Sequence, residues 1–264
     1  SDQIASELEV PVAAGPAELA AACDVVVLCV SADDDVLEVV DQLAGSLRPG
    51  AIVIDCSTVS ADTAREAARR LGSRDVDFLD APVSGGVEGA RKGTLAIMVG
   101  GPEAAFERSR PVLEAMGRTV TRFGGTGAGQ AAKATNQIMC AGIIQAVAEA
   151  MAFAKAEGLP LEALIDTLGQ GAGSSWYFVH RAPNIVRGSY PPGFRVRLHE
   201  KDLRICREMA ARHGVRLPLV EAALHQYRQL IEQGHGDEDI STVFRLTDAL
   251  FAAGDRGAGE PPGG

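Results

Sequence analysis

Short motifs for metal binding, nucleophilic hydrolysis and nucleotide triphosphate binding are missing from this sequence of 264 residues. It contains no CxxC, HExxH, GxSxG or GxxxxGK[ST], and its five histidines form no metal-ligand pair beside an acidic residue. The five cysteines are odd in number and widely spaced, so they predict neither a disulfide framework nor a zinc site. Zinc proteases, serine hydrolases and P-loop triphosphatases therefore have no support.

A positive charge excess is also missing. The formal net charge is −10, and a protein that binds phosphate backbones needs a basic face, so nucleic acid is not an expected partner. We identify no membrane span and no basic-then-apolar leader, and we expect neither a membrane partner nor a location outside the cytoplasm. A small carboxylate substrate stays compatible, because one local cation can hold it on an acidic protein.

Lysine is scarce as well. Only four of the 25 basic residues are lysines, namely Lys92, Lys133, Lys155 and Lys201. Because arginine serves elsewhere, each lysine is a candidate for a specific role. We expect Lys92 and Lys155 to be surface residues, which leaves Lys133 and Lys201.

The first half of the chain alternates apolar runs with helical patterns. We predict strands at 24–30, 51–55, 77–80, 94–100 and 119–123. The first of these is apolar throughout, which is typical of a strand buried on both faces. Helices are predicted from Ser60 to Leu71 and from Pro102 to Met116. This alternation predicts an α/β fold with a doubly wound, mainly parallel sheet.

Strand patterns end at Gly127, where a helix without breakers begins and continues to Gly158. Such a helix spans roughly 40 Å at about 1.5 Å per residue. Its middle, 138–153, is apolar almost all round, as in a helix buried between two partners. Further helices are predicted near 160–169, 195–213, 217–233 and 240–252. We therefore predict an α/β domain at 1–126, an all-helical domain at 127–254, and a disordered Gly/Pro-rich tail at 255–264.

The turn Asp80–Gly86 follows directly on a predicted strand. Ser84 offers a hydroxyl, and Gly85 and Gly86 allow a ligand to approach backbone N–H groups closely. Open α/β sheets bind their ligands at the carboxyl ends of strands. A plain strand-to-helix turn is the alternative.

Two further clusters lie on predicted helices. Lys133 shares a helix face with Asn136 and Gln137, and its alanine neighbours predict desolvation that lowers its pKa into a range useful for proton transfer. A lysine that extends to water is the alternative. Lys201 and Asp202 lie near the start of the next long pattern, where a solvated helix start is the ordinary interpretation.

Together these segments resemble the β-hydroxyacid dehydrogenases, a family that includes 3-hydroxyisobutyrate dehydrogenase, tartronate semialdehyde reductase and the glyoxylate/succinic semialdehyde reductases. The resemblance is colinear over almost the whole chain and is specific in its order and spacing. It is carried by Asp55-Cys-Ser-Thr58, Asp80-Ala-Pro-Val-Ser-Gly-Gly86, Gly93-Thr-Leu95, Met98-Val-Gly-Gly101, Gly127-Ala-Gly-Gln-Ala-Ala-Lys133 with Asn136-Gln137, and Lys201-Asp-Leu203.

The resemblance implies an oxidoreductase that transfers hydride between NAD or NADP and a β-hydroxyacid or short semialdehyde. It implies that Lys133 is the general acid/base and that Ser84, Gly85 and Gly86 hold the substrate carboxylate. Substrate contacts are further implied for Asp202 and for the pair Asn136 and Gln137, of which either one could bond the substrate. Cofactor contacts are implied for Val30, Ser31, Thr58 and Lys201. A Rossmann-type domain, an all-α domain with a long interdomain helix, and a homodimer or homotetramer are also implied.

The chain departs from the family pattern at its start. The family begins with a strand, a GxGxxG turn, a helix and a second strand, and the turn binds the pyrophosphate. No such motif occurs here, so we expect an N-terminally truncated sheet that lacks this first βαβ unit and binds cofactor poorly. The residue that would separate NAD from NADP is also missing.

Two other functions stay open. Imine reductases share the two-domain plan but usually lack a lysine at the position of Lys133, and a non-catalytic dimeric protein could have lost cofactor binding. The substrate is equally open. An aromatic run at 176–178 could line a pocket or pack in a core, while Arg195 and Arg197 could face an acid group or water.

Overall fold

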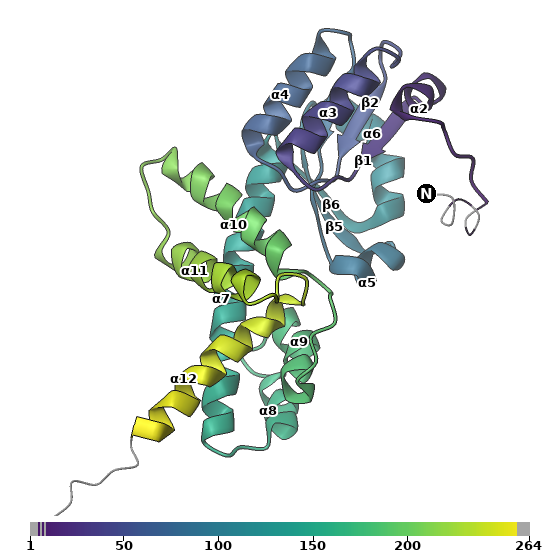
Figure 1. Cartoon of the computed structure of the whole chain (residues 1–264). Helices are drawn as coiled ribbons and strands as arrows, with labels where there is room; N and C mark the ends of the chain where they lie inside the picture. The colour runs from purple at the N-terminus through teal and green to yellow at the C-terminus, as the bar shows by residue number, and fades with distance from the viewer. Residues whose placement is uncertain (1–4, 6, 8, 258–264) are drawn as a thin grey trace, which may run out of the picture. The chain divides into compact units, whose positions relative to one another are not determined.

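A computed structural model describes residues 5, 7 and 9–257, and in it the chain forms two compact units (Figure 1). The first unit is Ser1–Lys133 and the second is Ala134–Gly264. The division falls inside helix α7 (Ala128–Ala156), whose first turns belong to the α/β unit. The predicted boundary at 126/127 lies just before that helix.

The α/β unit contains a mixed six-stranded sheet with the order β1-β2-β3-β5-β4, and β6 also pairs with β5. The strands are β1 (Val25–Leu28), β2 (Ile52–Asp55), β3 (Asp77–Asp80), β4 (Val83–Ser84), β5 (Leu95–Gly100) and β6 (Gly117–Gly124). Separate apolar cores lie on its two faces. One core is built with α3 and α4 and the other with α6, so the sheet is doubly wound as predicted.

Strands β1, β2 and β3 run parallel, with Leu28 opposite Asp55 and Asp55 opposite Asp80. Strand β5 runs antiparallel to β3 and β4 but parallel to β6. The sheet is thus less uniformly parallel than predicted. Strand β4, only two residues long, has no readable periodicity, and the sequence interpretation treated it as a turn.

The first predicted strand is correct in place but wrong in its burial. Val26 and Leu28 are buried, whereas Val27 is 41% exposed and Cys29 is exposed. Within the described residues β1 pairs only with β2, which makes it an edge strand with one open face. Cys29, directly after this strand, is therefore not a core residue, whereas Cys56, directly after β2, is buried.

The helices of this unit are α2 (Pro16–Ala22), α3 (Asp33–Ala44), α4 (Ala61–Gly72), α5 (Gly86–Arg91) and α6 (Glu103–Met116). Ser60 caps α4, since its hydroxyl accepts a hydrogen bond from the Thr63 N–H at 3.0 Å. Gly117 ends α6. The predicted bounds of α4 and α6 are confirmed, because capping residues mark both.

The second unit is helical. Its elements are the remainder of α7, α8 (Leu161–Leu168), α9 (Trp176–Arg187), α10 (Val196–Ala211), α11 (Pro218–Glu232), the short 3₁₀ helix η1 (Ile240–Val243) and α12 (Phe244–Gly257). The sequence interpretation missed α9, although Ser175 caps its start and Gly188 adopts a left-handed conformation at its end. The predicted disordered tail is wrong at its first residues, which belong to α12, and 258–264 lie outside the described residues.

Among the described residues α7 is long and apolar enough, by length and composition, to cross a membrane. This corrects the statement that the chain has no such run. A helix in the middle of a protein core passes the same test, and α7 contributes Ile144, Ala148 and Met151 to the two apolar clusters of the helical unit. Its apolar middle is thus explained by packing against other helices.

The start of α7 approaches the sheet so closely that a side chain would not fit. A Cβ at Gly129 would lie 2.5 Å from the carbonyl oxygen of Asp80 and closer still to that of Met98. Both obstacles are backbone atoms in the middle of the sheet and cannot rotate away. Glycine at this position therefore sets how near α7 lies to β3 and β5.

We expect Gly129→Ala to lower the free energy of unfolding by about 3 kcal/mol, because the helix start must move away from the strands. Gly125→Ala is the matched control, since a Cβ there would meet no atom within 4 Å. Urea denaturation of both variants checks this. Equal stability of Gly129→Ala and the unaltered protein would contradict the close approach.

Candidate active site

The carboxylate of Asp80, at the end of β3, caps the N-terminus of α7. It accepts hydrogen bonds from the backbone N–H of Gly127 at 2.8 Å and of Gln130 at 2.9 Å. Asp80 is fully buried, and burial raises its pKa while these N–H groups act in the opposite direction. An anion at the positive end of the helix dipole thus fixes the helix that carries Lys133.

Lys133 lies one turn further along α7 and is buried, with 7% of its surface exposed. Its Nζ donates a hydrogen bond to the carbonyl oxygen of Val83 at 2.9 Å. Ser84 is the next residue, so the structure brings the predicted acid/base next to the predicted substrate turn. The interpretation of Lys133 as a lysine that extends to water is thereby excluded.

The turn after Ser84 requires glycine. Gly85 has φ 134° and Gly86 has φ 63°, both in a region that L side chains rarely adopt. Ser84 is half-buried, and Gly85 and Gly86 are exposed at the start of α5. The loop thus presents a hydroxyl and accessible backbone N–H groups near the amine of Lys133, which is a suitable donor set for a carboxylate.

The segments after β1 and β2 carry the predicted cofactor residues of this unit. The Val30 N–H donates to the Ser57 hydroxyl at 2.8 Å, which ties the two strand ends together. Thr58 is half-buried between buried Ser57 and Val59, and Ser31 is exposed. Backbone and hydroxyl groups at the carboxyl ends of adjacent parallel strands fit one face of a nicotinamide dinucleotide, as open α/β sheets generally do.

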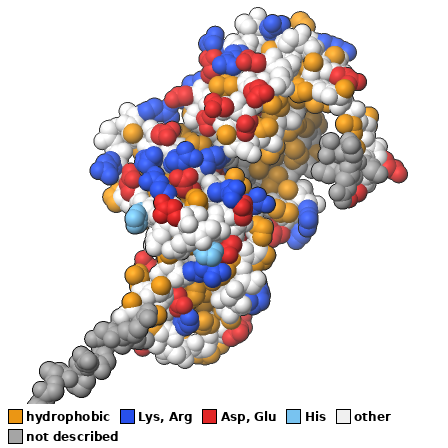
Figure 2. All heavy atoms as spheres, viewed as in Figure 1, with side chains coloured by type: hydrophobic (Ala, Val, Ile, Leu, Met, Phe, Trp, Pro, Cys, Tyr) orange, Lys and Arg blue, Asp and Glu red, His pale blue; other side chains and the backbone are white. Residues whose placement is uncertain are grey.

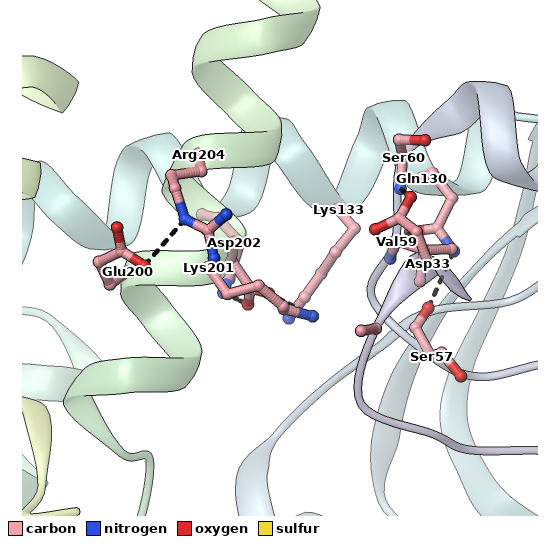
Figure 3. A network of polar contacts seen from close by, with 12 residues as sticks. Asp33, Ser57, Val59, Ser60, Gln130, Lys133, Glu200, Lys201, Asp202 and Arg204 are labelled. Atoms are coloured by element: carbon pink, nitrogen blue, oxygen red, sulfur yellow. Dashed lines mark hydrogen bonds and ion pairs between the residues drawn. The ribbon is translucent and has the colours of Figure 1, made fainter. Parts of the chain in front are cut away.

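Gln130 was quoted in the sequence motif but given no role. Figure 3 shows its side chain directed to the segment that contains Ser57 and Val59. The amide Nε2 donates to the Ser57 carbonyl oxygen at 2.8 Å, and Oε1 accepts from the Val59 N–H at 3.2 Å. Its position three residues before Lys133, on the same helix face, was the available signal.

Asp55 is a buried carboxylic acid with an incomplete set of partners. One oxygen accepts from the Ser57 N–H at 2.9 Å, and Oδ2 has no hydrogen-bond partner. Burial, together with the nearby charges of Asp80 and Asp33, raises its pKa to about 6, even though Ser57 acts to lower it. Near neutral pH this group is poised to change its charge.

The helical unit holds the other predicted site residues in a cluster of its own. Gln137 Nε2 donates to Asp202 Oδ2 at 2.7 Å, and Asn136 Nδ2 donates to Gln137 Oε1 at 2.8 Å. The Lys201 ammonium lies 3.1 Å from Asp202 Oδ1. The last pair appears in Figure 3. Asp202 and Gln137 are buried, so this is a connected polar network and not a solvated helix start.

A buried histidine supports this network, and the sequence interpretation passed over it. His199 has no exposed surface, and its Nδ1 lies 2.9 Å from the Tyr227 hydroxyl. Its Nε2 lies 3.3 Å from the backbone oxygen of Gln137. Both ring nitrogens are thus satisfied, which ties α10 to α7 and α11. Burial raises the pKa of Tyr227, so its hydroxyl stays protonated and can donate.

The remaining candidates take ordinary structural positions. Phe178 is buried, and Trp176 is 53% exposed and stacks on His180. Arg195 and Arg197 are exposed and lie beside Asp237. Lys92 and Lys155 are exposed as predicted. None of the five cysteines, all of which lie within the described residues, forms a disulfide, and no group of three or more His, Cys, Asp or Glu in that part of the chain could hold a metal.

Charged side chains of both signs are interspersed on the visible surface (Figure 2). Basic residues gather over α10 and α11, where Glu200 lies 3.0 Å from Arg204 and 3.7 Å from Arg228. Acidic partners within this cluster offset its positive charge.

A doubly wound sheet, with a buried lysine on a helix that starts against its strand ends, is typical of nicotinamide-dependent oxidoreductases. Family comparison agrees. Residues 2–125 match the NAD binding domain of 6-phosphogluconate dehydrogenase, and residues 127–247 match the NAD-binding domain of NADP-dependent 3-hydroxyisobutyrate dehydrogenase. The chain belongs to the β-hydroxyacid dehydrogenase family, and its cofactor class is NAD or NADP.

Individual relatives support the same assignment. The L-threonate dehydrogenase of Cupriavidus necator is 38% identical over 245 residues, which are 91% of this chain and 82% of that protein. The NAD-dependent L-serine dehydrogenase of Pseudomonas aeruginosa is 37% identical over 79% of this chain and 72% of its own. The structure of Mycobacterium tuberculosis 3-hydroxyisobutyrate dehydrogenase with L-serine has a TM-score of 0.82 at 34% identity, with 93% and 88% of the two chains covered.

The raised pKa of Asp55 predicts a pH-dependent stability. Its folded value of about 6 exceeds the ordinary 3.8, so the folded state binds the proton more tightly than the unfolded state. This contribution is complete below pH 4 and is lost as the pH rises through 6. Asp55→Asn should remove it, so the stability of the variant relative to the unaltered protein should rise by up to about 3 kcal/mol from pH 4 to pH 8. Denaturant titrations across that range check this, and a constant difference would contradict it.

The Tyr227 hydroxyl is predicted to stabilise the helical unit. Tyr227→Phe leaves a ring nitrogen of His199 buried without its partner, which should cost about 1–3 kcal/mol. Tyr190→Phe is the control, because no hydrogen bond of that hydroxyl occurs within the described residues. Thermal unfolding should show a lower Tm for the first variant only. Equal Tm values would mean that the hydrogen bond between the Tyr227 hydroxyl and His199 does not stabilise the protein.

Proposed function

We propose that this protein transfers hydride between NAD or NADP and a β-hydroxyacid or short semialdehyde, with Lys133 as the general acid/base. The observation that carries this proposal is the hydrogen bond of Lys133 Nζ to the Val83 carbonyl oxygen at 2.9 Å, immediately before the Ser84-Gly85-Gly86 turn. This contact supports the proposal because it brings the proposed proton-transferring amine close to the proposed carboxylate-binding turn.

The nicotinamide, when bound, accepts or supplies the hydride at the hydroxyl-bearing carbon. During oxidation Lys133, as the free amine, accepts the proton of the substrate hydroxyl. The C–O single bond becomes the double bond of a carbonyl as the hydride leaves the carbon. During reduction the ammonium returns that proton to the carbonyl oxygen. The Val83 carbonyl oxygen orients Nζ, so that proton transfer needs little reorganisation.

The Ser84-Gly85-Gly86 turn is proposed to bind the substrate carboxylate. The Ser84 hydroxyl and the exposed backbone N–H groups of the two glycines are neutral donors, which bind a carboxylate without competing with Lys133 for charge. Thr58, Val30 and Ser31 are proposed cofactor contacts in the same unit. The substrate roles of Asn136, Gln137 and Asp202, and the cofactor role of Lys201, stay predictions for the helical unit.

The relatives narrow the substrates to test. Two of them act on L-threonate and L-serine, which are small hydroxy acids, and the third is named for 3-hydroxyisobutyrate. We propose a substrate of the same class, with one carboxylate and a hydroxyl within one or two carbons of it. Titration with NADH and NADPH, followed by nicotinamide fluorescence, would identify the cofactor before these acids are screened.

Lys133→Ala should lower kcat/KM for the hydroxyacid by about 10²–10⁴, because the proton of the substrate hydroxyl loses its acceptor. Lys92→Ala, which changes an exposed lysine, is the control and should leave turnover intact. Absorbance of the reduced nicotinamide measures both. Full turnover by Lys133→Ala would refute the mechanism. Imine reduction that survives in this variant, without hydroxyacid oxidation, would favour the imine reductase alternative, and no turnover by the unaltered protein would favour a non-catalytic one.

A further inference from the structure

Within the residues that the structure describes, the side-chain hydrogen bonds of Gln130 all go to one short backbone segment. It is 1% exposed, and its amide bonds to the Ser57 carbonyl oxygen and the Val59 N–H, the groups on either side of Thr58. The planar Gln130 amide thus supplies the Ser57–Val59 segment, which follows strand β2, with the kind of hydrogen bonds that a neighbouring strand would otherwise make. Such a two-point contact restricts the backbone dihedral angles of Thr58.

The same segment is tied to the neighbouring strand end. The Ser57 hydroxyl accepts the Val30 N–H at 2.8 Å, and the Ser57 N–H donates to Asp55 at 2.9 Å. A movement of Ser57 would therefore move the Val30 backbone as well. Both predicted cofactor segments of the α/β unit depend on a chain of hydrogen bonds that starts at Gln130.

Gln130 itself is fixed on its own helix. Its backbone N–H donates to the Asp80 carboxylate at 2.9 Å, and the preceding Gly129 lies against backbone oxygens of the sheet. Lys133 follows one helical turn later on the same face. The distance between the Lys133 amine and the Thr58 backbone is thus set through one helical turn and one side chain.

We infer that Gln130 is a positioning residue that sets the Ser57–Val59 segment, which carries the proposed cofactor contact Thr58, relative to the Lys133 amine. The inference rests on the proposed function. Proton transfer at Lys133 and hydride transfer at the nicotinamide act on the same carbon–oxygen unit, so a displacement of about 1 Å between them can slow turnover about 10²-fold. Gln130 does not itself donate or accept the transferred proton.

A purely structural role would predict something different. If Gln130 only satisfied two buried backbone groups, its replacement would lower the stability of the protein. It would not lower kcat selectively while the KM of the substrate stays constant. The positioning role predicts a loss in the hydride step itself. It also predicts that substrate binding at the Ser84 turn stays unchanged, because the Gln130 amide bonds to Ser57 and Val59 and, within the described part of the chain, not to that turn.

The test uses the full chain with Gln130→Met, which keeps a similar length and removes both hydrogen bonds. Gln130→Glu keeps an acceptor for the Val59 N–H but cannot donate to the Ser57 oxygen when ionised. Val40→Ala, which shortens a buried core residue of α3, controls for lost stability. Amide hydrogen exchange of Val59, with the Val53 amide in the β2 ladder as internal reference, gives a readout that does not depend on activity.

We expect Val59 exchange in Gln130→Met to quicken by about tenfold or more, while Val53 exchange changes no more than in Val40→Ala. We expect kcat to fall by about 10–100-fold with a larger primary deuterium isotope effect, while the KM of the hydroxyacid stays within about twofold. The Val59 exchange rate of Gln130→Glu should lie between those of Gln130→Met and the unaltered protein.

Unchanged Val59 exchange in Gln130→Met would overturn the contact to this segment. If Val59 exchange in Gln130→Met is faster but its kcat equals that of the Val40→Ala control, the positioning role is overturned while the proposed function stands. A raised substrate KM at constant kcat would have the same meaning. No turnover by the unaltered protein with any tested hydroxyacid would overturn the proposed function, and the positioning role with it.

Discussion

The capping of α7 by the buried Asp80 carboxylate is the interaction on which the rest of the site depends. It joins the carboxyl end of β3 to the positive end of a 29-residue helix. The cap works only because Gly129 lets the helix start lie against the backbone of β3 and β5. Lys133 and Gln130 gain their positions from this junction, one toward the Val83 oxygen and the other toward the Ser57–Val59 segment.

Buried carboxylates are costly, and this unit contains two on adjacent strands. Asp55 and Asp80 lie opposite each other in register, and both have pKa values raised by burial. Asp80 is compensated by backbone N–H groups at a helix start, whereas one oxygen of Asp55 has no partner. A fold selected for stability alone would replace Asp55, so its presence beside the Ser57–Thr58 segment is typical of a site that trades stability for function.

The helical unit also buries carboxylates, and these have both charged and neutral partners. His199 connects the Tyr227 hydroxyl with the Gln137 backbone oxygen, and Gln137 in turn holds the Asp202 carboxylate. Asp239 anchors the chain before α10, since its carboxylate accepts from the N–H groups of Gly193 and Phe194 at 3.2 and 3.1 Å. The polar groups of this network are matched within an apolar surrounding, which restricts the helices to one arrangement.

The amino-acid sequence alone predicts the fold class and most element bounds, because these depend on local signals. It also suggests Lys133 as the acid/base, through the resemblance of its motifs to one family. Alternating apolar runs, capping residues such as Ser60 and Gly117, and the breaker-free run after Gly127 each act within a few residues. Sequence order also placed Ser84, Lys133 and Lys201 within one family motif set. Helix α9 was missed although its caps were readable.

The contacts between side chains and backbone groups that are far apart in the sequence follow from the tertiary structure alone. The contact of Lys133 with Val83 joins residues 50 positions apart, and that of Gln130 with Ser57 joins residues 73 apart. The burial of His199 and the exposure of Val27 depend on which neighbours cover each face. No local pattern encodes such pairings, because hydrogen-bond partners and desolvation are set by strand order and helix packing, which bring distant residues together.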